Sequence, residues 1–157
     1  MTNPFLPSDL INYLEYNYGT DLTLVSIAGG INNYIYLIKR PIGTSILKLY
    51  PTSKTNYRTR MNNEIRVLNY LHQMGFTNIP KPLAWSKKAN WAIFSHLKGD
   101  KIHKLDQSVL IDFMSFVKKL YYTSHHSVDL SLPNASEACY SIYDHCIHIK
   151  RRLSRFY

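Results

Sequence analysis

A single lysine interrupts a stretch of the chain that otherwise has the residue types of a buried β-strand. Residues 45–50 read SILKLY, and Lys48 shares a strand face with Ile46 and Tyr50 if the backbone alternates regularly. An ammonium group on such a face must reach water or find an anion, because an unpaired buried charge is costly. Lys48 therefore limits both the fold and the chemistry that this chain can have.

Four further segments have the residue types of short strands. With 45% hydrophobic and 13% aromatic residues, the composition favours a packed core over disorder. Short connections, including a turn with Pro41 and Gly43, favour an antiparallel meander. The predicted strands are residues 22–27, 34–39, 45–50, a short edge strand within 79–85, and 91–97. We therefore expect an antiparallel sheet of about five strands.

Apolar residues at helical spacing predict helices before and after the first three strands. Residues 8–18 begin with Ser8 as a candidate cap, and Gly19 is a candidate stop. A second helix is ended by Gly75, and its apolar stripe consists of Met61, Ile65, Leu68, Leu71 and Met74. The helix with this stripe is the one expected to pack on the sheet.

The chain becomes helical after residue 106. One face of the helix over 107–126 consists of Leu110, Phe113, Val117 and Leu120, and a final helix has one seam of Cys139, Ile142, Cys146, Ile149, Leu153 and Phe156. The two cysteines are interpreted as small buried apolar residues, since about 10 Å of helix separates them. The predicted class is α+β, with a lobe over residues 1–97, a polar hinge or linker over 98–106 and the helical start of a second lobe over 107–157.

Two glycines and a glutamate accompany the strand lysine. Gly29 and Gly30 lie between two predicted strands, where their backbone amides can face phosphate oxygens and Asn32 can add a side-chain donor. Glu64 lies in the following helix and can turn inward beside Lys48. Taken separately, an ordinary hairpin turn and solvated surface charges explain these residues. In this order and spacing they favour the arrangement with which kinases hold the phosphates of ATP.

The segments around these residues resemble a known family. GGINNYIYLIK (29–39), ILKLY (46–50), the stretch from NNEIRV to KPLAW (62–85) and WAIFSHLKGDKI (91–102) are similar to the N-terminal lobe of aminoglycoside phosphotransferase and choline kinase-like enzymes. The resemblance continues more weakly through the later helices. It implies a protein kinase-like fold and transfer of the γ-phosphoryl group of ATP to a small-molecule hydroxyl.

The resemblance also implies roles for individual residues. Gly29, Gly30 and Asn32 would lie over the phosphates, although the loop lacks the full G-x-G-x-x-G pattern of protein kinases. Lys48 would contact the α- and β-phosphates, and Glu64 would orient Lys48.

Residues 95–97 are similar to the hinge of the family. Ser95, His96 and Leu97 would join the two lobes, and backbone groups of Ser95 and Leu97 would meet the adenine. The resemblance therefore predicts ATP as the ligand of this lobe.

The catalytic groups of the family have no counterpart in the sequence. The family uses an aspartate in an H-x-D type loop as base, and an asparagine and a second aspartate to hold Mg²⁺. Asp144 and His145 stand in the wrong order, and the spacing from His126 to Asp129 is wrong. We therefore expect no catalytic residue or metal ligand in this chain, and no activity from the chain alone.

A truncated product or half of a split kinase, with the C-terminal lobe supplied in trans, would explain the uncapped apolar seam. A non-catalytic nucleotide-binding or regulatory partner is the alternative, and the acceptor is not specified.

The net charge of +9 leaves another class of function open. Lys150, Arg151, Arg152 and Arg155 form a basic helix end, as in a basic domain that binds nucleic acid or another protein. No nucleic-acid motif accompanies them, and the basic residues also complement the helix dipole.

His145 and His148 are better explained by surface roles than by a metal site. The sequence has no secretory signal and no membrane-length apolar run, so we expect a cytoplasmic protein.

Overall fold

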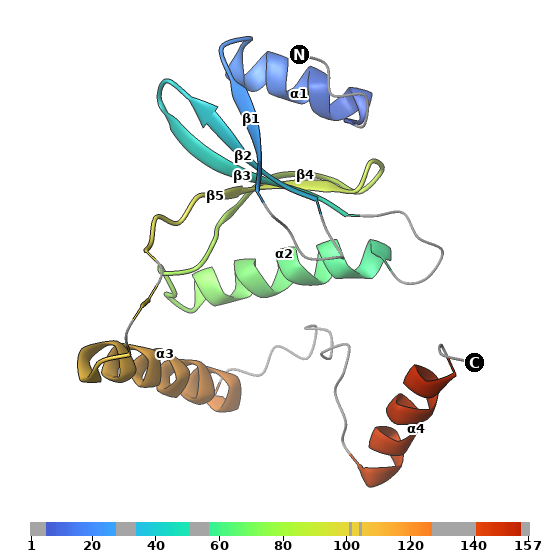
Figure 1. Cartoon of the computed structure of the whole chain (residues 1–157), viewed down its shortest axis with the longest axis vertical. Coiled ribbons are helices and arrows are strands. Elements are labelled where there is room, and N and C mark those ends of the chain that lie inside the picture. The colour runs from blue at the N-terminus through green and yellow to red at the C-terminus, as the bar shows by residue number, and fades with distance from the viewer. Residues whose placement is uncertain are drawn as a thin grey trace.

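The chain forms a five-stranded antiparallel sheet with a helix on each of its faces, and its last two helices lie farther from the sheet (Figure 1). The computed structural model describes residues 6–27, 34–50, 57–100, 102–103, 105–126 and 141–154. The elements are α1 (Ser8–Tyr18), β1 (Thr23–Ile27), β2 (Tyr34–Arg40), β3 (Gly43–Leu49), α2 (Tyr57–Gln73), β4 (Pro82–Ser86), β5 (Trp91–Ser95), α3 (Gln107–His126) and α4 (Ile142–Leu153). The α+β class predicted from the sequence is confirmed.

The strand order is β1-β2-β3-β5-β4, and every neighbouring pair is antiparallel. The first three strands form the predicted meander, and the β4–β5 hairpin adds its second strand to β3. Lys48 lies opposite Ile35 of β2 and opposite Ala92 of β5. The strand that contains this lysine is therefore the central strand of the sheet.

Alternation along β3 sends its side chains into two separate cores. Leu47 points to the face covered by α1, where Leu10, Ile38 and Ile93 are fully buried with it. Ile46 and Tyr50 point to the other face, which the apolar stripe of α2 covers. Besides the predicted α2, the short helix α1 thus packs on the sheet, because Leu10 and Leu14 are four residues apart and share one helix face.

The ends of α1 differ in how well the sequence predicted them. The expected cap, Ser8, is instead the first helical residue, and Pro7 occupies the N-cap position without a side-chain cap. The carbonyl of Pro7 accepts hydrogen bonds from the amides of Leu10 and Ile11, which leaves no capping role for Ser8. The predicted stop at Gly19 is confirmed, since its amide donates to the Glu15 carbonyl at 3.0 Å and ends the helix.

Replacing Gly19 by alanine is expected to lower the free energy of unfolding by about 2 kcal/mol. Gly19 has φ 72° and ψ −171°, a backbone conformation that is strained for any residue with a Cβ, although no atom lies within 4 Å of an added one. Gly99→Ala is the matched control, because Gly99 has the same open surroundings without a positive φ. Urea unfolding of both variants measures the difference, and equal losses would contradict the backbone argument.

Helix α3 begins at a well-formed cap and contacts the residues that follow α2. The Val109 amide and the Ser108 hydroxyl donate to Oδ1 of Asp106 at 2.9 and 2.8 Å, and in that order they lower the pKa of this carboxyl. Farther along the helix, the rings of Phe116 and Phe76 meet edge to face, with centroids 5.7 Å apart.

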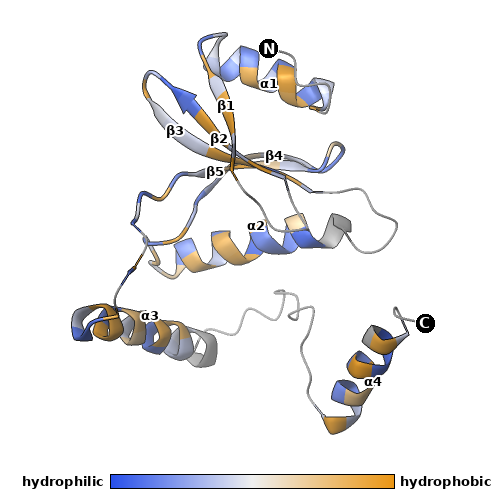
Figure 2. Ribbon diagram, in the orientation of Figure 1, coloured by the Kyte–Doolittle hydropathy of each residue, from blue (hydrophilic) through white to orange (hydrophobic). Residues whose placement is uncertain are grey.

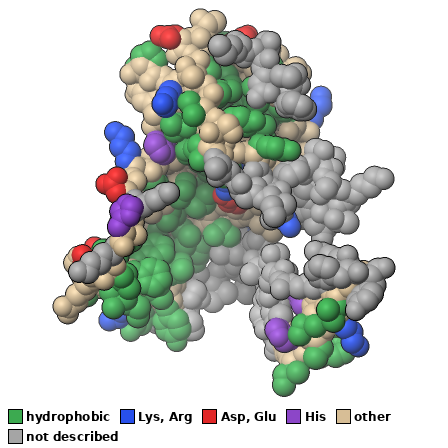
Figure 3. Space-filling view, viewed as in Figure 1, with side chains coloured by type: hydrophobic (Ala, Val, Ile, Leu, Met, Phe, Trp, Pro, Cys, Tyr) green, Lys and Arg blue, Asp and Glu red, His purple; other side chains and the backbone are tan. Residues whose placement is uncertain are grey.

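Figure 2 shows many hydrophobic residues along α3. Among the described residues, most apolar side chains of this helix are exposed. The expected face of the helix is exposed as well, at 46% for Leu110, 60% for Phe113, 38% for Val117 and 38% for Leu120. Figure 3 shows a hydrophobic surface over this helix.

Helix α4 has its predicted seam, but that seam is not buried. Ile142 is 85% exposed, Ile149 45% and Leu153 54%, and Cys146 between them is exposed too. The interpretation of Cys146 as a buried residue is therefore wrong, because the seam to which it belongs has no covering layer among the described residues. Cys139 and Phe156 lie outside the described residues. In the described part of the chain, no helix is both long enough and apolar enough to cross a membrane.

Candidate functional site

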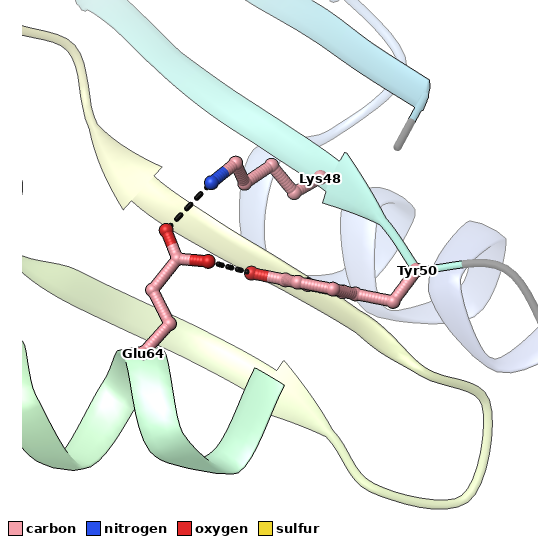
Figure 4. Close-up of polar contacts among 3 residues, drawn as sticks. All are labelled: Lys48, Tyr50 and Glu64. Atoms are coloured by element: carbon pink, nitrogen blue, oxygen red, sulfur yellow. Dashed lines mark hydrogen bonds and ion pairs between the residues drawn. The ribbon is translucent and has the colours of Figure 1, made fainter. Parts of the chain in front are cut away.

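A lysine on the central strand and a glutamate on α2 form the charged centre of the candidate site (Figure 4). Nζ of Lys48 lies 2.6 Å from Oε1 of Glu64, and the two side chains are 21% and 33% exposed. Strand alternation turns Lys48 toward α2, and Glu64 lies one residue before the buried Ile65 of the same helix. The contact expected from the sequence is thus present, and the ammonium is neither free in water nor buried without a partner.

Tyr50 completes this charged centre from the end of β3. Its hydroxyl donates to Oε2 of Glu64 at 2.8 Å, so each carboxylate oxygen has one partner. Burial, followed by the charge and the hydrogen bond of Glu64, raises the pKa of Tyr50 above its ordinary value. The hydroxyl therefore stays protonated at neutral pH. The two-residue spacing along the strand places Tyr50 on the same face as Lys48, but no role for Tyr50 was predicted from it.

The surroundings of the Lys48 ammonium are aromatic as well as anionic. Its Nζ lies 5.6 Å from the centroid of the Phe94 ring and 6.0 Å from that of Tyr50. An ammonium group has three donors, and within the described residues only Glu64 accepts a hydrogen bond from this one. Two donors are therefore available to an anionic ligand beside the carboxylate.

A cavity of about 250 Å³ opens next to this centre. Its lining combines the charged pair with apolar side chains and with the segment after β5: Ile46, Lys48, Glu64, Pro80, Phe94, Ser95, His96 and Leu97. Cavities for drug-sized ligands usually measure about 300–1,000 Å³, so this one suits a planar ring with an attached anionic group better than a large ligand enclosed on all sides. The lining therefore offers an apolar part to a ring and the ammonium of Lys48 to an anionic group.

The end of β5 and the residue after it are held to the residue before β4 and to β3. The Ser95 amide donates to the Lys81 carbonyl at 2.9 Å, and the Ser95 hydroxyl accepts from the Lys81 amide at 2.8 Å. Nδ1 of His96 and Oγ1 of Thr44 on β3 form a 2.7 Å hydrogen bond. The amide of Ser95 is therefore used within the protein, whereas no hydrogen bond to the Leu97 amide occurs among the described residues.

The structure brings five of the eight predicted site residues to one cavity. These are Lys48, Glu64, Ser95, His96 and Leu97. The other three, Gly29, Gly30 and Asn32, lie outside the described residues. Contact of the five with a nucleotide stays a prediction. In the ranges that the structure describes, no three histidine, cysteine, aspartate or glutamate side chains gather as metal ligands would.

The comparison with protein families agrees with this arrangement. The model of the phosphotransferase enzyme family matches residues 23–120, which is more than half of the 157 residues and runs from β1 into α3. The chain therefore belongs to the phosphotransferase enzyme family, and the resemblance drawn from the sequence is confirmed. No individual curated protein matches the chain.

Proposed function

We propose that residues 1–97 form the ATP-binding lobe of a kinase that phosphorylates a hydroxyl group of a small molecule. Residues 98–106 are the hinge of this kinase, and residues 107–157 begin its second lobe. The observation that carries the proposal is the contact between Lys48 and Glu64 at the mouth of an apolar cavity. Family membership supports the reaction class, since the family consists of phosphotransferases.

In this proposal the charged centre holds the phosphates and the cavity holds the base. Lys48 donates its two remaining hydrogen bonds to the α- and β-phosphates, and Glu64 keeps the ammonium in place. The Leu97 amide and a backbone group of Ser95 meet the edge of the adenine. Gly29, Gly30 and Asn32 cover the phosphates from the preceding loop. Mg²⁺, when bound, neutralises phosphate charge, and its ligands belong to a part of the kinase that these residues do not provide.

Binding of ATP by this lobe does not by itself give phosphoryl transfer. Positioning and charge neutralisation supply most of the rate in such reactions, and they need a base and metal ligands around the γ-phosphate. The sequence contains no H-x-D type loop. We therefore propose that the 157 residues bind ATP without turnover, and that the remaining part of the C-terminal lobe, supplied in trans, completes a cytoplasmic enzyme.

Calorimetric titration with ATP tests the proposal directly. Saturable binding, together with a higher melting temperature in ATP, is the expected result, and a phosphate-release assay should show no turnover by the chain alone. A parallel titration with short duplex DNA at two salt concentrations tests the class of basic interaction domains. Salt-sensitive DNA binding without any ATP binding would reject the kinase proposal.

A further inference from the structure

We infer that Tyr50 is a positioning residue for nucleotide binding: its buried hydroxyl holds one oxygen of Glu64 so that the other oxygen faces the ammonium of Lys48. This inference rests on the proposed function and deepens it. The residue acts through Glu64 and need not touch the ligand. Figure 4 shows the three side chains in this order, with the carboxylate between the amine and the phenol.

The carboxylate of Glu64 has a defined orientation because both of its oxygens are used. Oε1 accepts from Nζ of Lys48 at 2.6 Å, and Oε2 accepts from the hydroxyl of Tyr50 at 2.8 Å. A carboxylate with only one partner can rotate about its terminal torsion, whose energy profile is broad. The second hydrogen bond removes this freedom, so the ammonium is presented to a ligand from one direction.

Tyr50 can impose that orientation because it is itself held firmly. Its side chain packs with Met61, Ile65 and Phe94, and the residue is 5% exposed. Its amide donates to the carbonyl of Asn90 at 2.9 Å, which ties it to the turn between β4 and β5. The raised pKa of Tyr50 keeps the hydroxyl a donor throughout the physiological pH range. The carboxylate therefore meets a tightly packed partner that is protonated over this pH range.

The ring and the hydroxyl of Tyr50 have separable tasks. The ring fills the core under α2, and the hydroxyl makes the contact with Glu64. Tyr50→Phe keeps the ring, and Glu64 is 33% exposed, so water can hydrate the released oxygen. We therefore expect the variant to fold and to lose only the orientation of the carboxylate.

The expected effect is a loss of affinity for ATP that adenosine does not share. Tyr50→Phe should weaken ATP binding about fivefold, the range of one net hydrogen bond, because Lys48 no longer has a fixed orientation toward the phosphates. Adenosine has no phosphates, so its affinity should stay the same. A purely structural role in the core would weaken both ligands alike.

Calorimetry on a double-mutant cycle tests the inference. Wild type, Tyr50→Phe, Glu64→Ala and the double variant are titrated with ATP and with adenosine, and circular dichroism monitors folding. Tyr36→Phe is the control, since this tyrosine packs against the α1 core on the opposite face. The fivefold effect should disappear in the Glu64→Ala background.

Four outcomes would overturn the inference in distinguishable ways. Equal weakening of ATP and adenosine shows a structural role, and an unchanged fivefold effect without Glu64 shows that the hydroxyl acts by another route. If the wild type binds ATP and Tyr50→Phe binds it equally well, only the positioning role of Tyr50 is rejected. No ATP binding by the wild type rejects the proposed function, and the inference that rests on it fails as well.

Discussion

Replacing Lys48 by alanine is expected to weaken ATP binding at least about 150-fold. The ammonium has two donors free beside Glu64, and hydrogen bonds to charged groups contribute about 1.5–3 kcal/mol each. Lys48→Ala removes the direct contacts with the α- and β-phosphates. Tyr50→Phe keeps these contacts and disturbs only the direction of the ammonium, so its effect should be smaller. Isothermal titration calorimetry with ATP measures the change in Kd.

Lys39→Ala is the matched control for the Lys48 variant. Lys39 is exposed on β2 and its removal changes the net charge equally, so its effect on ATP affinity should be less than about twofold. Similar losses in the two variants would show that ATP responds only to the overall positive charge. That result would reject a specific phosphate contact at Lys48.

The largest loss of stability is expected from Leu47→Ala, at about 3 kcal/mol of unfolding free energy. Leu47 is fully buried on the central strand and packs in the core with Leu10, Ile38 and Ile93. Removing three carbons there loses their burial and leaves a cavity, since a helix on one side and a sheet on the other limit relaxation. Urea unfolding followed by circular dichroism measures the loss.

Ile42→Ala is the control that shows whether burial causes the loss of stability in Leu47→Ala. Ile42 is also an aliphatic residue next to β3, but it lies in the β2–β3 turn and is 88% exposed. Its replacement should change the free energy of unfolding by less than about 0.5 kcal/mol. If both variants lost the same stability, the core assigned to the α1 face of the sheet would be wrong.

Local patterns in the sequence predicted most of the elements closely. The helix over 107–126 was predicted with its observed bounds, and the stop at Gly75 agrees with a φ of 77° there. Such features depend on a few neighbouring residues, through side-chain periodicity and the conformational freedom of glycine. The strand pattern around Lys48 likewise depends on alternation within a few residues.

Predictions that depended on one particular contact partner of a residue were confirmed less often. Ser8 was expected to cap α1, but the Pro7 carbonyl takes the first hydrogen bonds of the helix. Cys146 was expected to be buried, although a seam is buried only where another element covers it. The hydrogen bond of Tyr50 to Glu64 joins residues fourteen positions apart, which no local rule selects.

The amino-acid order alone determined the strand and helix segments, the isolated cation among apolar side chains and the resemblance to a phosphotransferase lobe. All of these follow from short-range periodicity and from residue types. Only the tertiary structure decided that a phenol occupies the second oxygen of Glu64, and that the residues from Ser95 to Leu97 line the same cavity as the charged pair. Those contacts depend on the packing of α2 against the central strands, because packing brings distant residues within hydrogen-bonding distance while the chain order leaves their partners open.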